Sequence, residues 1–226
     1  SLTIFVMLKK IFFWIVLFSF FYTCTEPTQK MYQWRGDNRD GCYHEKNLLA
    51  SWSPDGPELL WVSDSVGLGY GSPVITGHAI YVNGMFDSTG YLVCLNMQGK
   101  IRWKTAYGKE WTKNFVGSRS TPTVVDTHVY VCGGLGDIAC FSSQSGEKIW
   151  QKNMFDSLGA VMPRFGISES LLVDGDFVYC TPGSKDTTMA ALNRRTGELI
   201  WACDADSEMP SYSSPLLFVH NSRKII

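Results

Sequence analysis

The stretch from Val129 to Trp150 decides the fold: Val-Tyr-Val-Cys-Gly-Gly-Leu-Gly-Asp-Ile-Ala-Cys-Phe-Ser-Ser-Gln-Ser-Gly-Glu-Lys-Ile-Trp. It predicts three short strands, the first two joined by a glycine-rich turn and the last two by a polar turn that contains Gly146. The chain contains this pattern three times. The other copies run from Ile80 to Trp103 and from Val178 to Trp201.

Each copy follows one more apolar strand, which adds a fourth strand to the unit. These leading strands begin at Ser72, Thr121 and Ser170, and a fourth copy begins at Ser214. A fragment of a final strand, residues 59–62, stands ahead of the first copy. The closing tryptophans, at 61, 103, 150 and 201, are 42, 47 and 51 residues apart. Four strands per unit at this period predict an all-β fold of antiparallel β-propeller blades, with about three and a half blades present.

Blades of this kind must bury both sheet faces against their neighbours. We interpret Trp61, Trp103, Trp150 and Trp201 as packing residues between sheets, with ligand contact as the alternative. Glycines at 99, 146 and 197 allow positive φ in the turn before the last strand. Equivalent positions hold Cys94, Cys140 and Ala191, which indicates a small apolar site filled by buried thiols, and a Cys132–Cys140 disulfide is the alternative.

Composition limits the classes of partner. The chain has 226 residues with 20 basic and 21 acidic side chains, so no basic field exists to bind nucleic acid. Its 14% aromatic content and 21 glycines fit a β protein rich in turns. The four histidines are scattered, no hydroxyl has an activating neighbour, and we assign no catalytic or metal-binding residue.

The N-terminus reads as an export signal. Lys9 and Lys10 precede an apolar run from Ile11 to Tyr22, which is short for a membrane span. Cys24 follows this run, as in the lipobox of bacterial lipoproteins, although Thr23 stands where a smaller residue is usual. We therefore predict a lipoprotein signal over residues 1–24 with lipid on Cys24, a simple signal peptide or an uncleaved anchor being the alternatives. Residues 25–33 form a polar tether.

Residues 34–41 read Trp-Arg-Gly-Asp-Asn-Arg-Asp-Gly and lack the spacing of an EF-hand loop. We expect a structured turn in which the arginines pair with the aspartates. This opening, the Ser-Pro first strands and the turn Leu-Asn-x-x-x-Gly-Glu-x-x-Trp, whose tryptophan is Trp201, resemble the PQQ-like β-propeller repeat family. Bacterial members of that family are described as pyrroloquinoline quinone (PQQ)-binding-like or as similar to the outer-membrane assembly lipoprotein BamB.

The resemblance covers residues 34–226 as one partial propeller domain and implies a ring of seven or eight blades. Because the sequence stops inside a fourth copy, we expect a chain truncated at its C-terminus. Residues 59–62 would then complete the last blade of the full ring.

Loops that enter the first strands surround one mouth of the central channel. They contribute Tyr70, Arg119, Arg164, Glu169 and Tyr212. Two arginines and a carboxylate among aromatic rings would bind a small anionic or polar ligand. The alternative is that Arg119, Arg164 and Glu169 pair with one another.

Three functions remain open. The first is a non-enzymatic, membrane-tethered scaffold in the periplasm or on the cell surface, with an envelope protein or glycan as partner. The second, implied by the resemblance, is a quinoprotein dehydrogenase that oxidises alcohols or sugars with PQQ and Ca²⁺, for which the chain lacks an adjacent cysteine pair. The third is a carbohydrate-associated module that stacks sugar rings on Tyr70, Trp111 or Tyr212.

Overall fold

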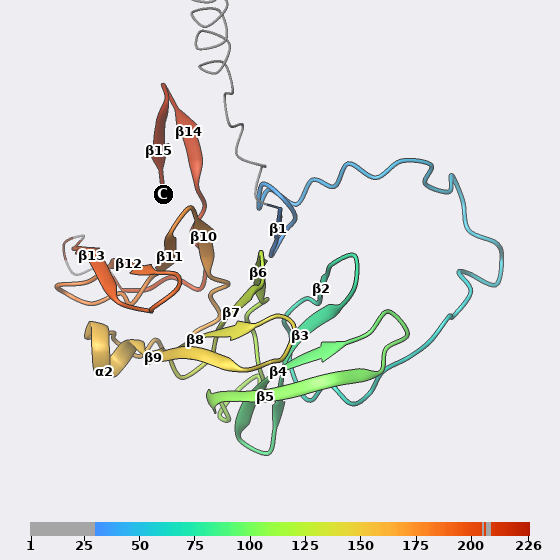
Figure 1. The fold of residues 1–226 in the computed structure, drawn as a ribbon, viewed down its shortest axis with the longest axis horizontal. Helices are drawn as coiled ribbons and strands as arrows, with labels where there is room; N and C mark the ends of the chain where they lie inside the picture. The colour runs from blue at the N-terminus through green and yellow to red at the C-terminus, as the bar shows by residue number, and fades with distance from the viewer. Residues whose placement is uncertain (1–29, 205, 207–208) are drawn as a thin grey trace, which may run out of the picture. The chain divides into compact units, whose positions relative to one another are not determined.

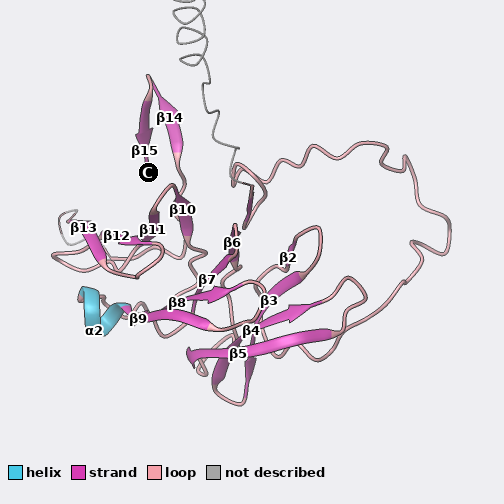
Figure 2. Cartoon of the chain, in the orientation of Figure 1, coloured by secondary structure: helices cyan, strands magenta, loops and turns pink. Residues whose placement is uncertain are grey.

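The computed structural model describes residues 30–204, 206 and 209–226, and Met31–Ile226 forms one compact unit. The predicted signal over residues 1–24, its Cys24 and residues 25–29 of the tether lie outside the described residues. Among the residues that are described, no helix is both long and apolar enough to span a bilayer. The described chain consists mainly of antiparallel strands and connections, with the five-residue helix α2 (Met154–Leu158) after the second sheet (Figure 2).

Three antiparallel sheets follow one another along the chain, and in each the four repeat strands lie in sequence order (Figure 1). The first sheet contains β2 (Val74–Ile75), β3 (Ile80–Phe86), β4 (Thr89–Leu95) and β5 (Ile101–Lys109). The second contains β6 (Thr123–Val125), β7 (His128–Cys132), β8 (Asp137–Ser142) and β9 (Lys148–Asn153), with β1 (Met31–Tyr32) added beside β6. The third contains β10 (Leu172–Asp174), β11 (Phe177–Cys180), β12 (Met189–Asn193) and β13 (Leu199–Cys203). The hairpin of β14 (Phe218–His220) and β15 (Arg223–Ile225) starts a fourth unit, which confirms the predicted fold of tandem four-stranded blades.

A tyrosine, a small residue and a tryptophan lie side by side across the last three strands of each blade. In the second blade Tyr130 pairs with Cys140, which pairs with Trp150, and the two rings lie 6.2 Å apart over the cysteine. The equivalent rows are Tyr81–Cys94–Trp103 and Tyr179–Ala191–Trp201, with rings 5.9 and 6.0 Å apart. The middle position must be small because the rings meet above it. Cys132 and Cys140 are buried free thiols, so the alternative disulfide does not form.

Three of the four closing tryptophans lie against the turn glycine of the following blade. Gly146 has a φ of 72°, and a Cβ on it would come within 2.5 Å of the Trp103 ring. The same contact joins Gly99 to Trp61 and Gly197 to Trp150, at 2.5 and 2.8 Å. Trp103 also packs against the buried cluster between the first and second sheets, and Trp150 belongs to the one between the second and third. Trp201 remains 39% exposed.

A second repeated contact joins the first strands of neighbouring blades. The backbone N–H of Ser72 donates to Thr121 Oγ1 at 3.0 Å, and the N–H of Thr121 donates to Ser170 Oγ at 2.9 Å. The N–H of Ser170 donates in turn to Ser214 Oγ at 2.8 Å. The hydroxyl residue that opens each first strand therefore accepts a hydrogen bond from the blade before it, which fixes the register between blades.

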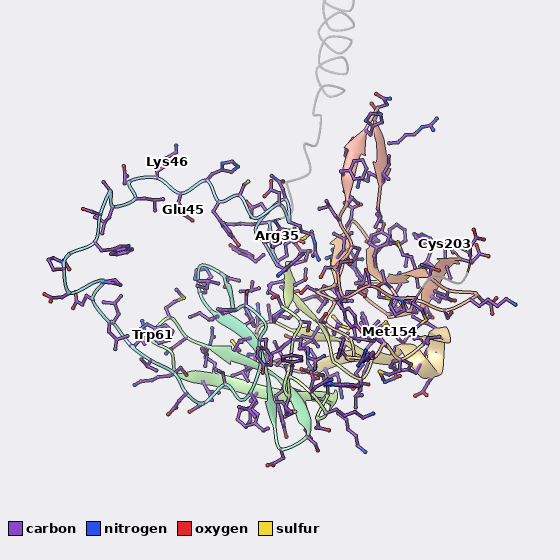
Figure 3. All side chains as sticks on the ribbon, turned by 180° about the vertical axis from the view of Figure 1, so that it is seen from behind. Arg35, Glu45, Lys46, Trp61, Met154 and Cys203 are labelled. Carbon is purple, nitrogen blue, oxygen red and sulfur yellow. The ribbon has the colours of Figure 1, made fainter. Side chains whose placement is uncertain are left out.

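Two segments differ from the sequence-based expectation. Residues 59–62 form no strand, because no described strand lies beside them to supply a ladder. Their Trp61 nevertheless contacts the Gly99 turn, and Figure 3 shows it on the long connection that also carries Glu45 and Lys46. β5 extends to Lys109 and pairs there with Thr89, so it takes up part of the expected connection over residues 104–116.

The turn over residues 34–41 is structured, but its arginines do not pair with aspartate carboxylates. Arg35 donates to the backbone carbonyl of Asp40, and Arg39 donates to the carbonyls of Ser170 and Leu171. Both guanidinium groups also lie over the Trp34 ring, at 5.3 and 5.6 Å from its centroid. Backbone oxygens thus replace the expected ion pairs.

We predict that Gly146→Ala lowers the free energy of unfolding by about 2 to 5 kcal/mol. A left-handed alanine costs about 1 to 2 kcal/mol, and pushing Trp103 aside adds about 1 to 3 kcal/mol. Gly175→Ala is the matched control, because Gly175 also has a positive φ, of 55°, but no atom lies within 4 Å of the point where its Cβ would stand. This variant should lose only the stability that the left-handed backbone conformation costs an alanine. Urea denaturation of both variants measures the difference, and equal losses would contradict the role of the Trp103 contact.

Candidate functional site

One side chain from each of four successive blades contributes to a single pocket. The contributing residues stand two positions before the hydroxyl residue that opens each first strand, and they are Tyr70, Arg119, Ser168 and Tyr212. Phe115 and Phe165 complete the lining of this cavity of about 370 Å³. The structure therefore brings together three of the five predicted site residues.

Close approach of two neighbouring loops places these side chains. Gly69 and Ser118 form a parallel bridge, in which the N–H of Tyr70 donates to the Ser118 carbonyl at 2.7 Å. A Cβ on Gly71 would stand 2.2 Å from the carbonyl oxygen of Ser120, so only glycine permits this approach. The glycines around Tyr70 thus let the first blade lie directly against the second.

Arg119 holds the pocket together rather than reaching for a ligand. Its guanidinium donates to the backbone carbonyls of Asn114, Phe115 and Phe165, and lies 5.6 Å from the centroid of the Trp111 ring. Partial burial lowers the pKa of this guanidinium. Trp111, one of the three candidates for sugar stacking, is 4% exposed and donates from Nε1 to Asn114. Arg119 therefore joins two loops that belong to different blades.

The polar groups of Tyr212 and Ser168 are also engaged inside the protein. Tyr212 Oη accepts from the N–H of Phe165 at 3.2 Å, and its ring lies 5.7 Å from the Phe165 ring. Ser168 Oγ donates to the Tyr212 carbonyl at 3.3 Å. Tyr70 is 66% exposed. What the pocket offers a ligand is chiefly the faces and edges of aromatic rings.

Arg164 and Glu169 do not join this pocket, and neither pairs with Arg119. Arg164 is exposed, with its guanidinium 5.2 Å from the centroid of the Phe165 ring. Glu169 is 2% exposed and accepts hydrogen bonds from the N–H and the hydroxyl of Thr181. Successive residues of an extended chain point to opposite sides, so Glu169 turns away where Ser168 faces the pocket.

Phe115, Phe165 and Ser168 are the lining residues that the sequence reasoning missed. The signal that identifies Ser168 is the register counted back from Ser170, rather than the nearest charged side chain in the loop. The buried Glu110 was also missed. It accepts from Tyr107 Oη at 2.5 Å and from the N–H of Gly134 at 2.8 Å, and so supports the hairpin turn of the second blade.

The lining residues do not fit a bound quinone cofactor. Among the described residues that line the pocket, Arg119 is the one cation, and its N–H groups already serve three backbone carbonyls. The carboxylates of pyrroloquinoline quinone would therefore meet one cation there, whose N–H groups are mostly bonded to the protein already. Within the part of the chain that the structure describes, no three His, Cys, Asp or Glu side chains are grouped to hold a metal ion.

Glu169 is expected to make stability depend on pH. Complete burial raises the pKa of its carboxyl from 4.5 to about 7, an effect that hydrogen bonds from Thr181 and the charge of Arg39 offset only in part. The folded state then keeps its proton up to about pH 7, whereas the unfolded state releases it near pH 4.5. The free energy of unfolding should therefore fall by about 3 kcal/mol as pH rises from 4.5 through 7.

We predict that Glu169→Gln removes this part of the pH dependence. Relative to the unmodified chain, the variant should gain stability between pH 5 and pH 8, as measured by urea denaturation at several pH values. Glu198→Gln is the control, because Glu198 is exposed in the turn before β13. If the Glu169→Gln variant lost stability with rising pH as steeply as the unmodified chain, the Glu169 carboxyl would not be the group that titrates.

The profile of the family described as outer membrane protein assembly factor BamB matches residues 45–153 and residues 134–223. Together the two matches reach from residue 45 to residue 223, well over half of the chain. Comparison with curated proteins gave no match.

Similar solved structures include a europium-containing methanol dehydrogenase, at 15% identity and a TM-score of 0.45 over 62% of this chain and 25% of that one. A quinohemoprotein alcohol dehydrogenase from Pseudomonas putida HK5 gives 14% identity and a TM-score of 0.46, over 62% and 21% of the two chains. The computationally designed Ika4 protein gives 13% and 0.44, over 75% and 90%. The chain thus spans about a quarter of the length of the methanol dehydrogenase, and at these scores the similarity says nothing about activity.

The family assignment depends on the profile matches and on the tandem sheets themselves. The first profile match covers the four repeat strands of the first and second sheets, and the second match covers the third sheet and reaches into the hairpin of β14 and β15. The chain therefore belongs to the family described as outer membrane protein assembly factor BamB, a family of PQQ-like β-propeller repeats.

Proposed function

We propose that this chain is a non-enzymatic binding and assembly scaffold of the cell envelope, which holds a protein partner at the aromatic pocket. In this proposal an apolar or aromatic side chain of the partner enters between Tyr70, Phe165 and Tyr212. The blades keep the pocket in place, and residues 1–24 carry the chain to the periplasm or the cell surface as a lipoprotein signal with Cys24 as the lipid attachment site.

The observation that supports this proposal most directly is the state of the polar groups around the pocket. Arg119 is bonded to three carbonyls, Tyr212 Oη accepts from a backbone N–H, and Ser168 Oγ donates to a carbonyl. A site that activates a substrate needs polar groups aimed at the reacting atoms. A site that anchors a partner needs ring faces and a rigid wall, and large aromatic residues commonly supply most of the energy of such contacts.

The family description and the N-terminal sequence support the location. The matching family is described by the assembly of outer membrane proteins, which fits a protein partner in the envelope. The apolar run from Ile11 to Tyr22, followed by Cys24, fits export and lipid attachment. Electrostatic recognition of nucleic acid has no support in a chain with 20 basic and 21 acidic residues.

We predict that a photo-reactive phenylalanine analogue in place of Tyr70 cross-links to a discrete envelope protein in cells that produce the full reading frame. The same analogue in place of Tyr43 is the control, since Tyr43 is comparably exposed at 65% but does not line the pocket. Adding Ser168→Trp, which fills the pocket, should reduce the Tyr70 product at least fivefold. Mass spectrometry of the product identifies the partner.

Two outcomes would contradict the scaffold function. One is equal cross-linking from positions 70 and 43, which would leave the pocket without a role in binding. The other is a stoichiometric change in quinone absorbance, with a rise in melting temperature, when the purified chain is titrated with pyrroloquinoline quinone and Ca²⁺. That result would favour a quinoprotein dehydrogenase instead.

A carbohydrate-associated module is the second candidate, because the same rings could stack on the faces of sugars. Tyr70 and Tyr212 come from different blades, and rings supplied by separate blades would suit a chain of sugar rings more than a single ring. Titration with soluble cello- and malto-oligosaccharides distinguishes the two candidates. Saturable binding that Tyr70→Ala weakens and Tyr43→Ala leaves unchanged would favour the glycan.

A further inference from the structure

The free edge of the second blade is occupied by the N-terminal part of the described chain. Met31 pairs with Val125 and Tyr32 pairs with Val124, so that β1 extends the sheet beyond β6. β6 is the first strand of its blade, and without β1 this edge would present unpaired N–H and C=O groups. Met31 and Tyr32 also pack against the buried clusters on either side of the second sheet.

Seven residues later the same segment reaches the third blade. Arg39 is 3% exposed and donates from Nη2 to the Ser170 carbonyl at 2.7 Å and from Nη1 to the Leu171 carbonyl at 3.0 Å. Nη1 also donates to Gln33 Oε1 at 3.1 Å. Ser170 and Leu171 directly precede β10. One guanidinium therefore bonds two consecutive backbone carbonyls of the third blade.

The chemistry of this contact selects an arginine. A planar guanidinium can bond two adjacent carbonyls at once, which a single ammonium group does less well. Burial lowers the pKa of Arg39 to about 10, so the side chain stays charged at neutral pH. Glu169 contributes a favourable charge interaction but does not bond to it, and among the described residues the ion pairs do not include Arg39.

The segment Met31–Gly41 contacts the second and third blades but leaves a cavity beside the third. A cavity of about 210 Å³ lies between it and the third blade, lined by segment residues such as Asp37 and Asn38 and by Val173, Asp174 and Leu217 from the blades. The turn that presents Arg39 is closed on itself, since Arg35 donates to the Asp40 carbonyl and the N–H of Cys42 donates to Asp40 Oδ1. The contact with the blades therefore depends on a short strand at one end and on one arginine at the other.

We propose that the edges of β6 and β10 form a groove for a peptide that pairs as a short strand and then turns to present an arginine, and that Met31–Gly41 occupies this groove in cis. The groove recognises two features, a backbone that pairs with β6 and an arginine seven residues after the paired tyrosine. A tethered occupant acts at a local concentration of about a millimolar. A partner segment with the same two features gains access when the tethered segment leaves. This groove is separate from the aromatic pocket, so the inference does not depend on the proposed function.

The test uses the full chain and a fluorescent peptide of residues 30–41. Binding, followed by fluorescence anisotropy, should be at least tenfold tighter to the Arg39→Ala chain than to the unmodified chain, whose own segment blocks the groove. A peptide that carries the Arg39→Ala change should bind the vacated groove at least tenfold more weakly. Lys46→Ala is the matched control chain, because Lys46 is an exposed cation in the connection that follows the segment and its loss should leave the groove filled.

Hydrogen exchange on the same chains reports whether the segment has left. In the Arg39→Ala chain the amides that bond between β1 and β6 should exchange at least tenfold faster, while those of β4 keep their protection and show that the blades remain folded. If the Arg39→Ala chain loses protection throughout, Arg39→Lys, which keeps the charge without the planar fork, takes its place. Unchanged exchange of the amides that bond between β1 and β6 overturns the proposal, and so does a vacated groove that fails to bind the peptide.

Discussion

The contact between a tryptophan ring and a glycine turn is the constraint on which the packing of the blades depends. At Gly146 and Gly197 the ring of the preceding blade lies where a Cβ would otherwise stand, and the turn also needs a positive φ. Only glycine meets both demands. The tyrosine that lies beside each tryptophan, with a small residue beneath the pair, holds the ring at a fixed tilt. Neighbouring sheets are thus held at the same relative position in successive blades.

The two complete interfaces between blades differ in the hydrogen bonds made by their tryptophan and tyrosine side chains. Trp150 Nε1 donates to the carbonyl of Arg194 in the next blade, whereas Trp103 Nε1 is buried without a partner. In that first interface Tyr81 Oη donates to the equivalent carbonyl, that of Ser143. The two interfaces thus share ring position more closely than hydrogen-bond pattern, as expected where packing carries most of the stabilisation.

The repeat was readable from the sequence because strands, turn glycines and small positions recur with a fixed order. Tyr70, Arg119 and Tyr212 were predictable for the same reason, since equivalent positions in successive blades must face the same space. Arg164 and Glu169 were predicted wrongly, because the charge of a side chain does not decide which way it points. The register of the strand does, and it places Ser168 in the pocket. Arg39 could not be placed at all, since its acceptors are backbone carbonyls and no residue type identifies them. Residues 59–62 have the composition of a strand, but pairing depends on a neighbour that local sequence does not specify.

The hydroxyl contacts between first strands run in one direction along the chain. Each blade supplies an acceptor to the blade before it and a donor to the blade after it, as Thr121 does for Ser72 and Ser170. Such head-to-tail interfaces close into a ring only when the rotation between units allows it. A gene segment that encodes one such unit carries both halves of the joint, so its tandem duplication would insert a compatible blade without any change to its neighbours. Evolution of blade number in this architecture would then be limited by ring geometry rather than by the need to invent new interfaces.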